Sequence, residues 1–183
     1  MDRAVALEIV NELVRTRNIR SHLLATEAIM RSLARRLEPE MEEHYGIVGL
    51  LHDADYEATE KEEARHTDVV TERLESLGAR RDIIDAIRGH CDKAPRRTTM
   101  AKAIYACDAL SGLIVAAALV RPDRTLEGLT TTSVLRRFRE RGFARGASRE
   151  EILTCEPELG IPLPEFTETC LEAMKGIAAE LGL

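Results

Sequence analysis

Apolar residues recur along this chain at the three- to four-residue spacing that places them on one face of an α-helix. No segment shows the strict alternation of apolar and polar residues that is typical of a half-buried strand. We therefore predict an all-α fold. The pattern predicts helices over these segments: residues 1–14, 18–37, 40–51, 66–77, 81–88, 98–120 and 164–181.

Proline and glycine residues mark where several of these helices end. Pro39 separates the second helix from the third, Gly78 stands in a C-cap position after the fourth, and Pro122 follows the long helix. The chain beyond this point carries shorter helical patterns, and the stretch SREEI at residues 148–152 resembles a capping box, with the serine three residues before the second glutamate. We predict a helical core over residues 1–124 and a helical C-terminal extension over residues 125–183 that packs on the core.

Composition is that of a soluble globular protein. The chain has 183 residues, of which 44% are hydrophobic and 32% charged, enough for one sizeable core. A net charge of −6 argues against general nucleic-acid binding through a basic surface. The longest apolar run, residues 109–120, is too short to span a bilayer. The charged first segment and four cysteines without a CxxC pair predict a cytoplasmic protein with reduced thiols; both a monomer and a homodimer remain open.

Four of the five histidines fall at or near the ends of predicted helices, where side chains from different helices can converge. His22 lies near the start of the second helix and His52 ends the third. His66 opens the fourth helix and His90 ends the fifth. His44 is the exception, since it lies about 12 Å along the helix axis from His52. We expect a structural or surface role for His44.

Two aspartates accompany these histidines. Asp53 follows His52 in the stretch GLLHDADYE, where an apolar helix ends in two titratable groups. Asp108 lies in AIYACDALSGLIVAAALV, the most apolar helix of the chain. A buried ionised carboxylate is costly unless it has a partner, so Asp108 must be paired, protonated or bound to a metal. The alternative to a metal is a hydrogen bond to the backbone or to a hydroxyl group such as that of Ser111.

The order of these residues along the chain resembles that of the HD superfamily of metal-dependent phosphohydrolases. The stretches HLLATEAIMRSLA, GLLHD, AIRGH and AIYACDAL are similar to the family's segments around the first histidine, the doublet, the later histidine and the closing aspartate. The resemblance covers roughly residues 18–120 and implies a compact helical bundle. The residues in that order are His22, His52, Asp53, His66, His90 and Asp108.

The resemblance also implies a binuclear metal site. Imidazole and carboxylate ligands suit Mn, Fe, Ni, Co or Zn, and Mg is a further candidate. Two such ions polarise a phosphoryl oxygen and lower the pKa of a bound water, so no serine or cysteine nucleophile is required. If His66 and His90 did not bind metal, the site would hold one ion. By the family pattern, one ion has the ligands His22, His52, Asp53 and Asp108, and the second has His66 and His90, with Asp53 bridging.

The chain departs from the family directly after the doublet. Many relatives continue with Ile-Gly-Lys, whose lysine helps to hold phosphate, whereas this chain reads HDADYE. We predict Asp53 and Asp55 as catalytic residues. Asp55 has two functional interpretations, as the partner of a metal-bound histidine or as a general base. The structural alternative is an aspartate at a helix end or turn.

An anionic substrate needs basic residues from elsewhere in the chain. Arg96 and Arg97 lie in the loop before the long helix, and Lys102 lies about two turns before Asp108. We predict these three basic residues as substrate-binding. An arginine cluster in the extension is either the solvent-exposed face of a helix or a cover for the site: Arg136, Arg137, Arg139, Arg141 and Arg145.

These features predict a metal-dependent hydrolase that cleaves a phosphomonoester or phosphodiester bond by metal-activated water. Its partner is a small phosphorylated substrate, with a nucleotide as one candidate. Three tyrosines and no tryptophan offer few rings on which a base could stack, so the nucleotide preference is open. One alternative is an HD-fold di-iron oxygenase that acts on a polyol or phosphonate. The other is a non-catalytic metal-binding regulatory module.

Overall fold

All regular structure in the described chain is helical, and no strand occurs there, which confirms the predicted all-α fold. The computed structural model describes residues 1–60 and 62–183. The helices are α1 (Arg3–Leu13), α2 (Arg17–Leu37), η1 (Pro39–Met41), α3 (Glu42–Leu51), α4 (Asp68–Ser76), α5 (Arg81–Gly89), α6 (Thr99–Leu119), α7 (Thr131–Arg139), α8 (Arg149–Leu153), α9 (Cys155–Leu159), α10 (Leu163–Lys175) and α11 (Ala178–Leu181).

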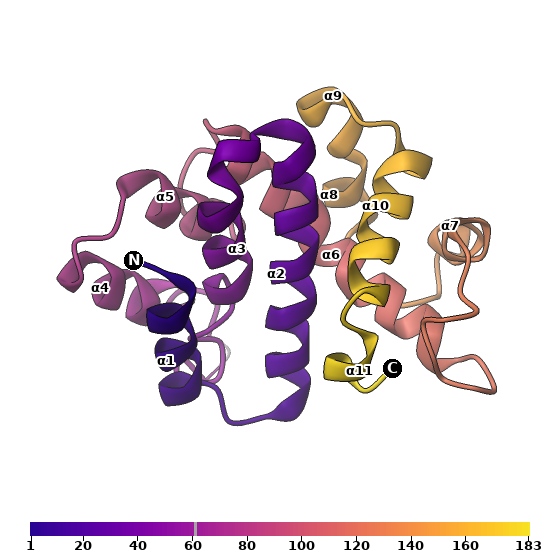
Figure 1. The fold of residues 1–183 in the computed structure, drawn as a ribbon, viewed down its shortest axis with the longest axis horizontal. Helices are drawn as coiled ribbons and strands as arrows, with labels where there is room; N and C mark the ends of the chain where they lie inside the picture. Colours follow the sequence, from indigo (N-terminus) through magenta and orange to yellow (C-terminus); the bar gives the residue numbers. More distant parts are fainter. Residues whose placement is uncertain (61) are drawn as a thin grey trace.

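Helices α2 and α3 form the centre of the fold (Figure 1). Pro39 ends α2 and begins the single turn η1, which reverses the chain into α3. All residues from Tyr45 to Leu51 are buried, so α3 is covered nearly all round. A Cβ atom on Gly49 would lie 2.7 Å from the main-chain oxygen of Thr26, which shows how closely the two helices approach. The end of α3, and the HD pair after it, therefore lies beside α2 inside the bundle.

Helix α6 runs through the interior and packs against α2, α5 and α8. Thr98 caps its start by accepting a hydrogen bond of 3.1 Å from the N–H of Ala101. Among the described helices, α6 alone is long and apolar enough to cross a membrane by length and composition. It is longer than the apolar run at residues 109–120, and 56% of its apolar window is buried inside the bundle. In this fold α6 is a core helix that carries Asp108.

Two helix boundaries differ from the sequence prediction. Helix α4 begins at Asp68 and not at His66, because Thr67 has a left-handed conformation with φ of 67°. The carboxylate of Asp55 accepts the main-chain N–H groups of Thr67 and Val70 and so stabilises this start. The predicted last helix is also divided, since Ile177 leaves helical geometry between α10 and α11.

Two predicted caps are present. Gly78 follows α4 with φ of 64°, the left-handed conformation that glycine adopts most easily. Ser148 accepts a hydrogen bond of 3.3 Å from the N–H of Glu151 at the start of α8. Local sequence patterns were sufficient to locate both helix ends.

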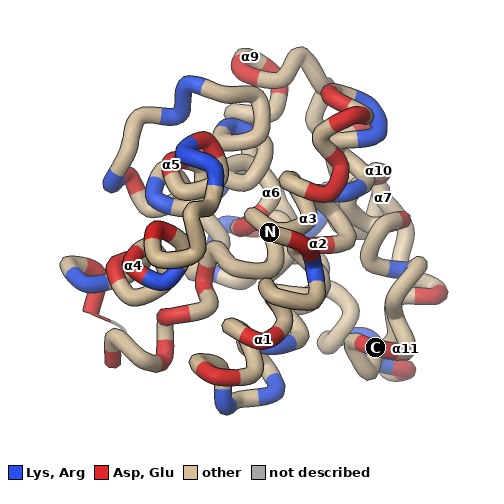
Figure 2. Tube along the Cα trace, turned by 60° about the vertical axis from the view of Figure 1, so that its left-hand side comes forward, with Lys and Arg blue, Asp and Glu red and all other residues tan. Residues whose placement is uncertain are grey.

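The C-terminal helices lie against α2 and α6 (Figure 1). The side chains of Phe166, Cys170 and Met174 on α10 are buried and belong to the same hydrophobic core as α2 and α3. One hydrophobic core includes residues from both sides of position 124. The division of the chain into a core and an extension at this position therefore stays a prediction. Acidic and basic residues are mixed along the trace (Figure 2).

Candidate metal centre

The six predicted ligands come from five separate parts of the fold and meet in one place. Helix α2 supplies His22 near its N-terminus, and the end of α3 supplies His52 and Asp53. His66 lies in the turn before α4, and His90 directly follows α5. The sixth, Asp108, lies in the middle of α6.

A first group of ligands surrounds the Nε2 atom of His22. This atom lies 3.1 Å from Nε2 of His52 and 3.0 Å from Oδ1 of Asp108. The Nε2 atom of His52 lies 3.4 Å from the same aspartate oxygen. The three side chains thus present their ligand atoms to one point.

A second group lies next to the first. Nε2 of His66 and Nε2 of His90 are 3.0 Å apart. Cys91, which the sequence analysis did not consider, lies nearby, and one ligand atom from each of these three residues falls within 4.8 Å of the other two. Burial raises the pKa of the Cys91 thiol.

Asp53 lies between the two groups. Its Oδ1 atom is 3.1 Å from Nε2 of His66 and 3.2 Å from Nε2 of His90. Its Oδ2 atom faces the first group, at 3.7 Å from Nε2 of His22 and 3.9 Å from Nε2 of His52. One carboxylate therefore offers an oxygen to each group.

The outer nitrogen of each imidazole ring has its own hydrogen-bond partner. Nδ1 of His52 donates to the carbonyl of Gly49 at 2.9 Å, and Nδ1 of His90 donates to the carbonyl of Ile87. Nδ1 of His66 lies 3.2 Å from a carboxylate oxygen of Asp55. The Nδ1 atom of His22 lies 3.1 Å from the hydroxyl oxygen of Ser111.

These outer contacts show that the residues fit a metal. A neutral imidazole that carries its proton on Nδ1 presents a lone pair at Nε2. At 3.1 Å and 3.0 Å, two such lone pairs would repel each other unless a cation lay between them. Imidazole nitrogens and carboxylate oxygens are the ligands that divalent transition metals prefer. The four histidines and two aspartates form a suitable donor set.

The electrostatics of the metal-free site point the same way. Burial lowers the pKa of His66, but hydrogen bonds with Asp53 and Asp55 outweigh this effect and raise it to about 9. Burial raises the pKa of Asp108, yet the charges and hydrogen bonds of His52 and His22 bring it below its usual value. The same competition holds the pKa of Asp53 well below its usual range. The site thus favours positive charge between its carboxylates.

Asp55 lies behind His66 and away from solvent. Its side chain has 0% exposure, and its two oxygens accept from His66 and from the main-chain N–H groups of Thr67 and Val70. The arrangement favours the interpretation of Asp55 as the partner of a metal-binding histidine over the interpretation as a general base. It is also the aspartate that supports the start of α4.

A match to a protein-family model agrees with this geometry. The model for the HD domain matches residues 19–113, which is more than half of the chain and includes all six predicted ligands. The chain belongs to the HD domain family. HD domains bind divalent metals and are in general metal-dependent hydrolases. No curated protein and no solved structure matched the chain.

Two further sequence predictions concern residues inside the HD domain, Asp108 and His44. The alternative that Asp108 bonds Ser111 is wrong, because the Ser111 hydroxyl contacts Nδ1 of His22 and Asp108 faces the two imidazoles. His44 lies two turns before His52 on α3. Its Nδ1 atom is buried, and no hydrogen-bond partner for it is found among the described residues.

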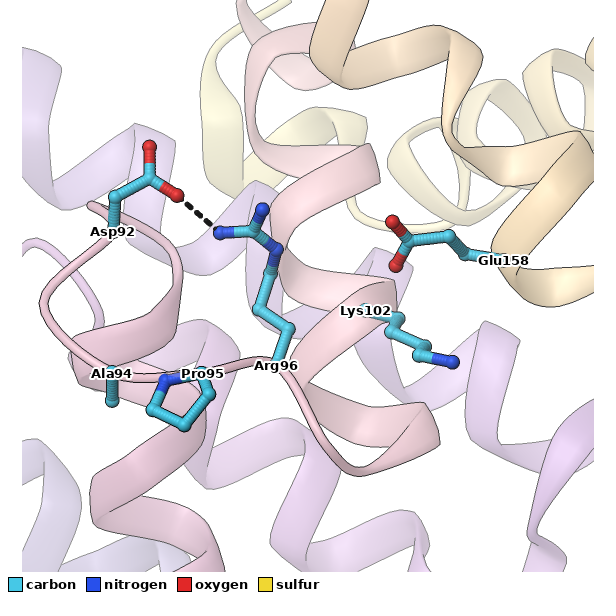
Figure 3. A pocket seen from close by; sticks show the side chains of 6 residues that line it. All are labelled: Asp92, Ala94, Pro95, Arg96, Lys102 and Glu158. Atoms are coloured by element: carbon cyan, nitrogen blue, oxygen red, sulfur yellow. Dashed lines mark hydrogen bonds and ion pairs between the residues drawn. The ribbon is translucent and has the colours of Figure 1, made fainter.

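The predicted phosphate contacts lie outside the metal centre of the HD domain. Arg96 donates to the carbonyl of Gly89 at 3.0 Å, forms an ion pair with Asp92, and stacks 3.6 Å from the ring centroid of Tyr105. Figure 3 shows Arg96 directed toward Asp92, with Lys102 in the same cavity. This cavity of about 540 Å³ has no metal-site residue in its lining. Arg97 is exposed. Substrate binding by these three basic residues stays a prediction.

A second cavity opens directly onto the metal centre. It has a volume of about 360 Å³ and includes His22 and Asp108 in its lining. Its opposite wall comes from the C-terminal extension, through Ala144, Gly146, Ala147 and Glu151. Burial raises the pKa of Glu151, a hydrogen bond with the Ser148 side chain lowers it, and the negative charge of Asp108 raises it.

Arg149 holds this wall in place. Its guanidinium donates to five main-chain carbonyls at 2.7–3.4 Å, all from the segment 137–147. The predicted arginine cluster behaves differently: Arg136, Arg139, Arg141 and Arg145 are exposed. Sequence analysis missed Arg149 and gave Glu151 only a role in a capping box, because neither stands out from the other charged residues of the extension.

Lys93 was also missed, although it supports the second group of ligands. Its Nζ atom donates to the main-chain carbonyl of His66 and, at 2.8 Å, to that of Ala64. It also lies 3.3 Å from the carboxylate of Asp68. Lys93 thus joins the turn that carries His66 to the chain just beyond His90.

Proposed function

We propose that this HD domain protein is a metal-dependent phosphohydrolase that cleaves a small phosphoester with water. The observation that carries the proposal is the position of Asp53, whose two oxygens face two separate groups of imidazole nitrogens. A bridging carboxylate of this kind suits a two-metal site, in which both the entering and the leaving oxygen of a phosphoryl transfer are stabilised.

In this proposal the chain supplies the ligands and holds them in place. His22, His52 and Asp108 would hold one ion, and His66 with His90 would hold the other. When bound, the ions supply Lewis-acid stabilisation of phosphoryl oxygens and lower the pKa of the attacking water. The Nδ1 hydrogen bonds keep each Nε2 atom free to bind, and the buried carboxylate of Asp55 orients His66.

The cavity at the metal centre favours a small phosphorylated metabolite over a nucleotide. Its volume is about 360 Å³, and no phenylalanine, tyrosine or tryptophan appears among the described residues that line it. Its lining also lacks lysine and arginine in the described part of the chain. The site therefore has few means of recognising a nucleobase or a polyphosphate.

The proposal is tested by metal analysis followed by kinetics. Protein purified without added metal is analysed for bound elements and then assayed on a panel of small phosphoesters with Mn, Mg, Ni, Co or Zn. We expect hydrolysis that a chelator abolishes and added metal restores. Two equivalents of iron with oxygen uptake on a polyol or phosphonate, and no phosphoester turnover, would favour the oxygenase alternative. Metal binding without turnover of any kind would favour the regulatory module.

A matched pair of histidine variants tests the number of ions. His66→Ala is expected to lower the metal content toward one ion per chain while the fold persists, because one ligand of the second group is lost. His44→Ala removes a histidine that lies outside the site and should leave the content unchanged. Native mass spectrometry gives the stoichiometry directly. Equal metal content in the two variants would exclude His66 from the site.

A further inference from the structure

Two neighbouring cavities lie beside His22 along one face of α6. The first, of about 360 Å³, is lined by Asp108 and by the C-terminal extension. The second, of about 450 Å³, lies further along α6 and is lined by Val115, Leu119 and residues of the chain end. Both include His22 and Gly112 in their lining, so Gly112 forms part of the floor of each.

Gly112 has no packing role that would explain a glycine. It lies inside the 21-residue helix α6, where alanine is more favourable than glycine. A Cβ atom built on Gly112 would meet no other atom within 4 Å. Gly49 provides the contrast, because there the backbone of α2 occupies the space that a Cβ would need. The space above Gly112 is left open beside the metal centre, as expected where a ligand approaches a helix backbone closely.

The wall opposite Gly112 carries a single charged group. Ala144, Gly146 and Ala147 are small residues, and Glu151 provides a carboxylate. Apart from His22 and Asp108, Glu151 is the one titratable residue among the described residues that line the first cavity. A carboxylate accepts hydrogen bonds and attracts cations, and it repels a second anion.

We propose that this space is a subsite for the alcohol portion of the phosphoester, and that Glu151 selects alcohols that carry a hydroxyl or ammonium hydrogen-bond donor. The inference rests on the proposed function and names the substrate class of the same site. The phosphoryl group lies at the metal centre, and its alcohol portion extends over Gly112 with its donor group toward Glu151. Small alcohols with a donor group are favoured over alcohols of the same size without one.

Three esters of equal length test this selection. They are ethyl phosphate, 2-hydroxyethyl phosphate and 2-aminoethyl phosphate, assayed with the metal-loaded protein. We expect kcat/KM to be about tenfold or more higher for the hydroxyl and amino esters than for ethyl phosphate, as one hydrogen bond to a charged acceptor allows. The larger advantage identifies which donor the subsite prefers.

Two variants of neighbouring residues test the role of Glu151. Glu151→Gln should reduce the advantage of the amino ester about tenfold, and that of the hydroxyl ester less, because an amide oxygen still accepts a hydrogen bond. Glu150→Gln changes an exposed glutamate one residue away and should leave all three values unchanged. Metal content should stay the same in both variants.

A third variant tests the space without the charge. Gly112→Leu places a side chain in the open region and should reduce turnover of all three esters at least several-fold. The melting temperature should hold or rise, because leucine is a better helix former than glycine. Unchanged kinetics in this variant would show that the alcohol does not pass over Gly112.

The results separate this inference from the proposed function. Hydrolysis of the three esters at equal kcat/KM, or an advantage of the amino ester that is undiminished in Glu151→Gln, overturns the subsite and leaves the phosphohydrolase intact. Failure of the metal-loaded parent protein to hydrolyse any phosphoester overturns both. A preference that is present in the parent and lost only in Glu151→Gln supports the assignment.

Discussion

At the scale of single residues, the site keeps its histidines oriented through atoms that do not bind metal. Each imidazole uses Nδ1 for a hydrogen bond to the protein and directs Nε2 inward. Three kinds of partner are used: main-chain carbonyls, a hydroxyl group and a carboxylate. Only the carboxylate, Asp55, raises the proton affinity of its histidine by charge as well as by orientation.

His66 makes the metal-free protein sensitive to pH. Its pKa is about 9 in the fold, compared with about 6.5 in an unfolded chain. The stability that results is fully present below pH 6.5 and is lost as the pH rises through 9, because the raised pKa belongs to the folded state. We expect a loss of about 2–3 kcal/mol across this interval in urea unfolding with a chelator present.

Two variants provide the check on this pH effect. His66→Gln should flatten the dependence of the unfolding free energy on pH between pH 6.5 and 9. His44→Gln should leave this dependence as steep as in the parent protein. A parent protein whose stability does not change over the interval would show that His66 is not held between two carboxylates.

Asp53 is expected to affect both ions at once. Asp53→Asn weakens one oxygen ligand and replaces the other with an amide nitrogen, so at least one of the groups that Asp53 faces loses its bridging ligand and the charge is lost from both. We expect both metal equivalents to bind more weakly, in contrast to the loss of one equivalent in His66→Ala. Titration with Mn or Co followed by elemental analysis measures this. Tight binding of a full two equivalents by Asp53→Asn would disprove the bridge.

The sequence was sufficient to predict that the six candidate ligands converge, because their identity and order carry the information. His22, Asp53 and Asp108 are recognisable from residue type and helical context alone. Lys93 and Arg149 were not, since their partners are main-chain carbonyls, which every residue has. Glu151 was assigned only a capping role, because its second role depends on how the extension packs over α6.

At the scale of elements, the closeness of α2 and α3 sets the distance between the first histidine and the doublet. The two backbones nearly touch at Gly49, one turn before His52. Periodicity predicted both helices and their turn at Pro39, but it cannot report how near two helices lie. It also misplaced the start of α4, because that start depends on Asp55, which lies 12 residues before Thr67.

Gly49→Ala is expected to destabilise the protein. The added Cβ would lie 2.7–2.8 Å from main-chain atoms of Thr26 and Glu27, so one helix must shift. Overpacking of this kind costs roughly 1–3 kcal/mol. Thermal unfolding of the metal-free protein measures the effect, with Gly112→Ala as the control that should be neutral or stabilising. Equal melting temperatures for the two variants would contradict the close approach.

Lys93 is expected to act on the second ion through the turn between Asp55 and α4. Lys93→Met removes the donor to the carbonyl of His66 while keeping most of the side-chain volume. We expect the second metal equivalent to bind about tenfold or more weakly, since hydrogen bonds from a charged group are lost, and the first to be retained. Lys102→Met is the control, because Lys102 lines the cavity that contains Arg96 and none of the predicted metal ligands. The idea fails if the two variants titrate alike.

At the scale of the whole molecule, the C-terminal extension lines the cavity beside the predicted metal ligands. Its small residues and Glu151 face the metal ligands across a cavity. Its position depends on the burial of α10 against α2 and on Arg149, which gathers the carbonyls of the segment 137–147.

Arg149→Met is expected to loosen this wall without removing the ions. Five carbonyls lose a charged donor, and the loss of about 1.5–3 kcal/mol should lower the melting temperature by roughly 5 °C or more. Metal content should remain that of the parent. Arg145→Met changes an exposed arginine of the same segment and is expected to melt like the parent. Similar melting curves for both variants would show that Arg149 does not organise the segment.

The cavity has one wall inside the matched HD domain and one wall outside it. All six predicted ligands fall within residues 19–113, whereas Glu151 and its small neighbours do not. Under the proposed function, mutations in the extension can therefore alter which ester is accepted while the predicted ligands stay unchanged. Duplicated genes that inherit this arrangement can therefore diverge in substrate through changes in a short C-terminal segment. Their common ancestry would still be recognisable from the sequences of the helices that carry the histidines.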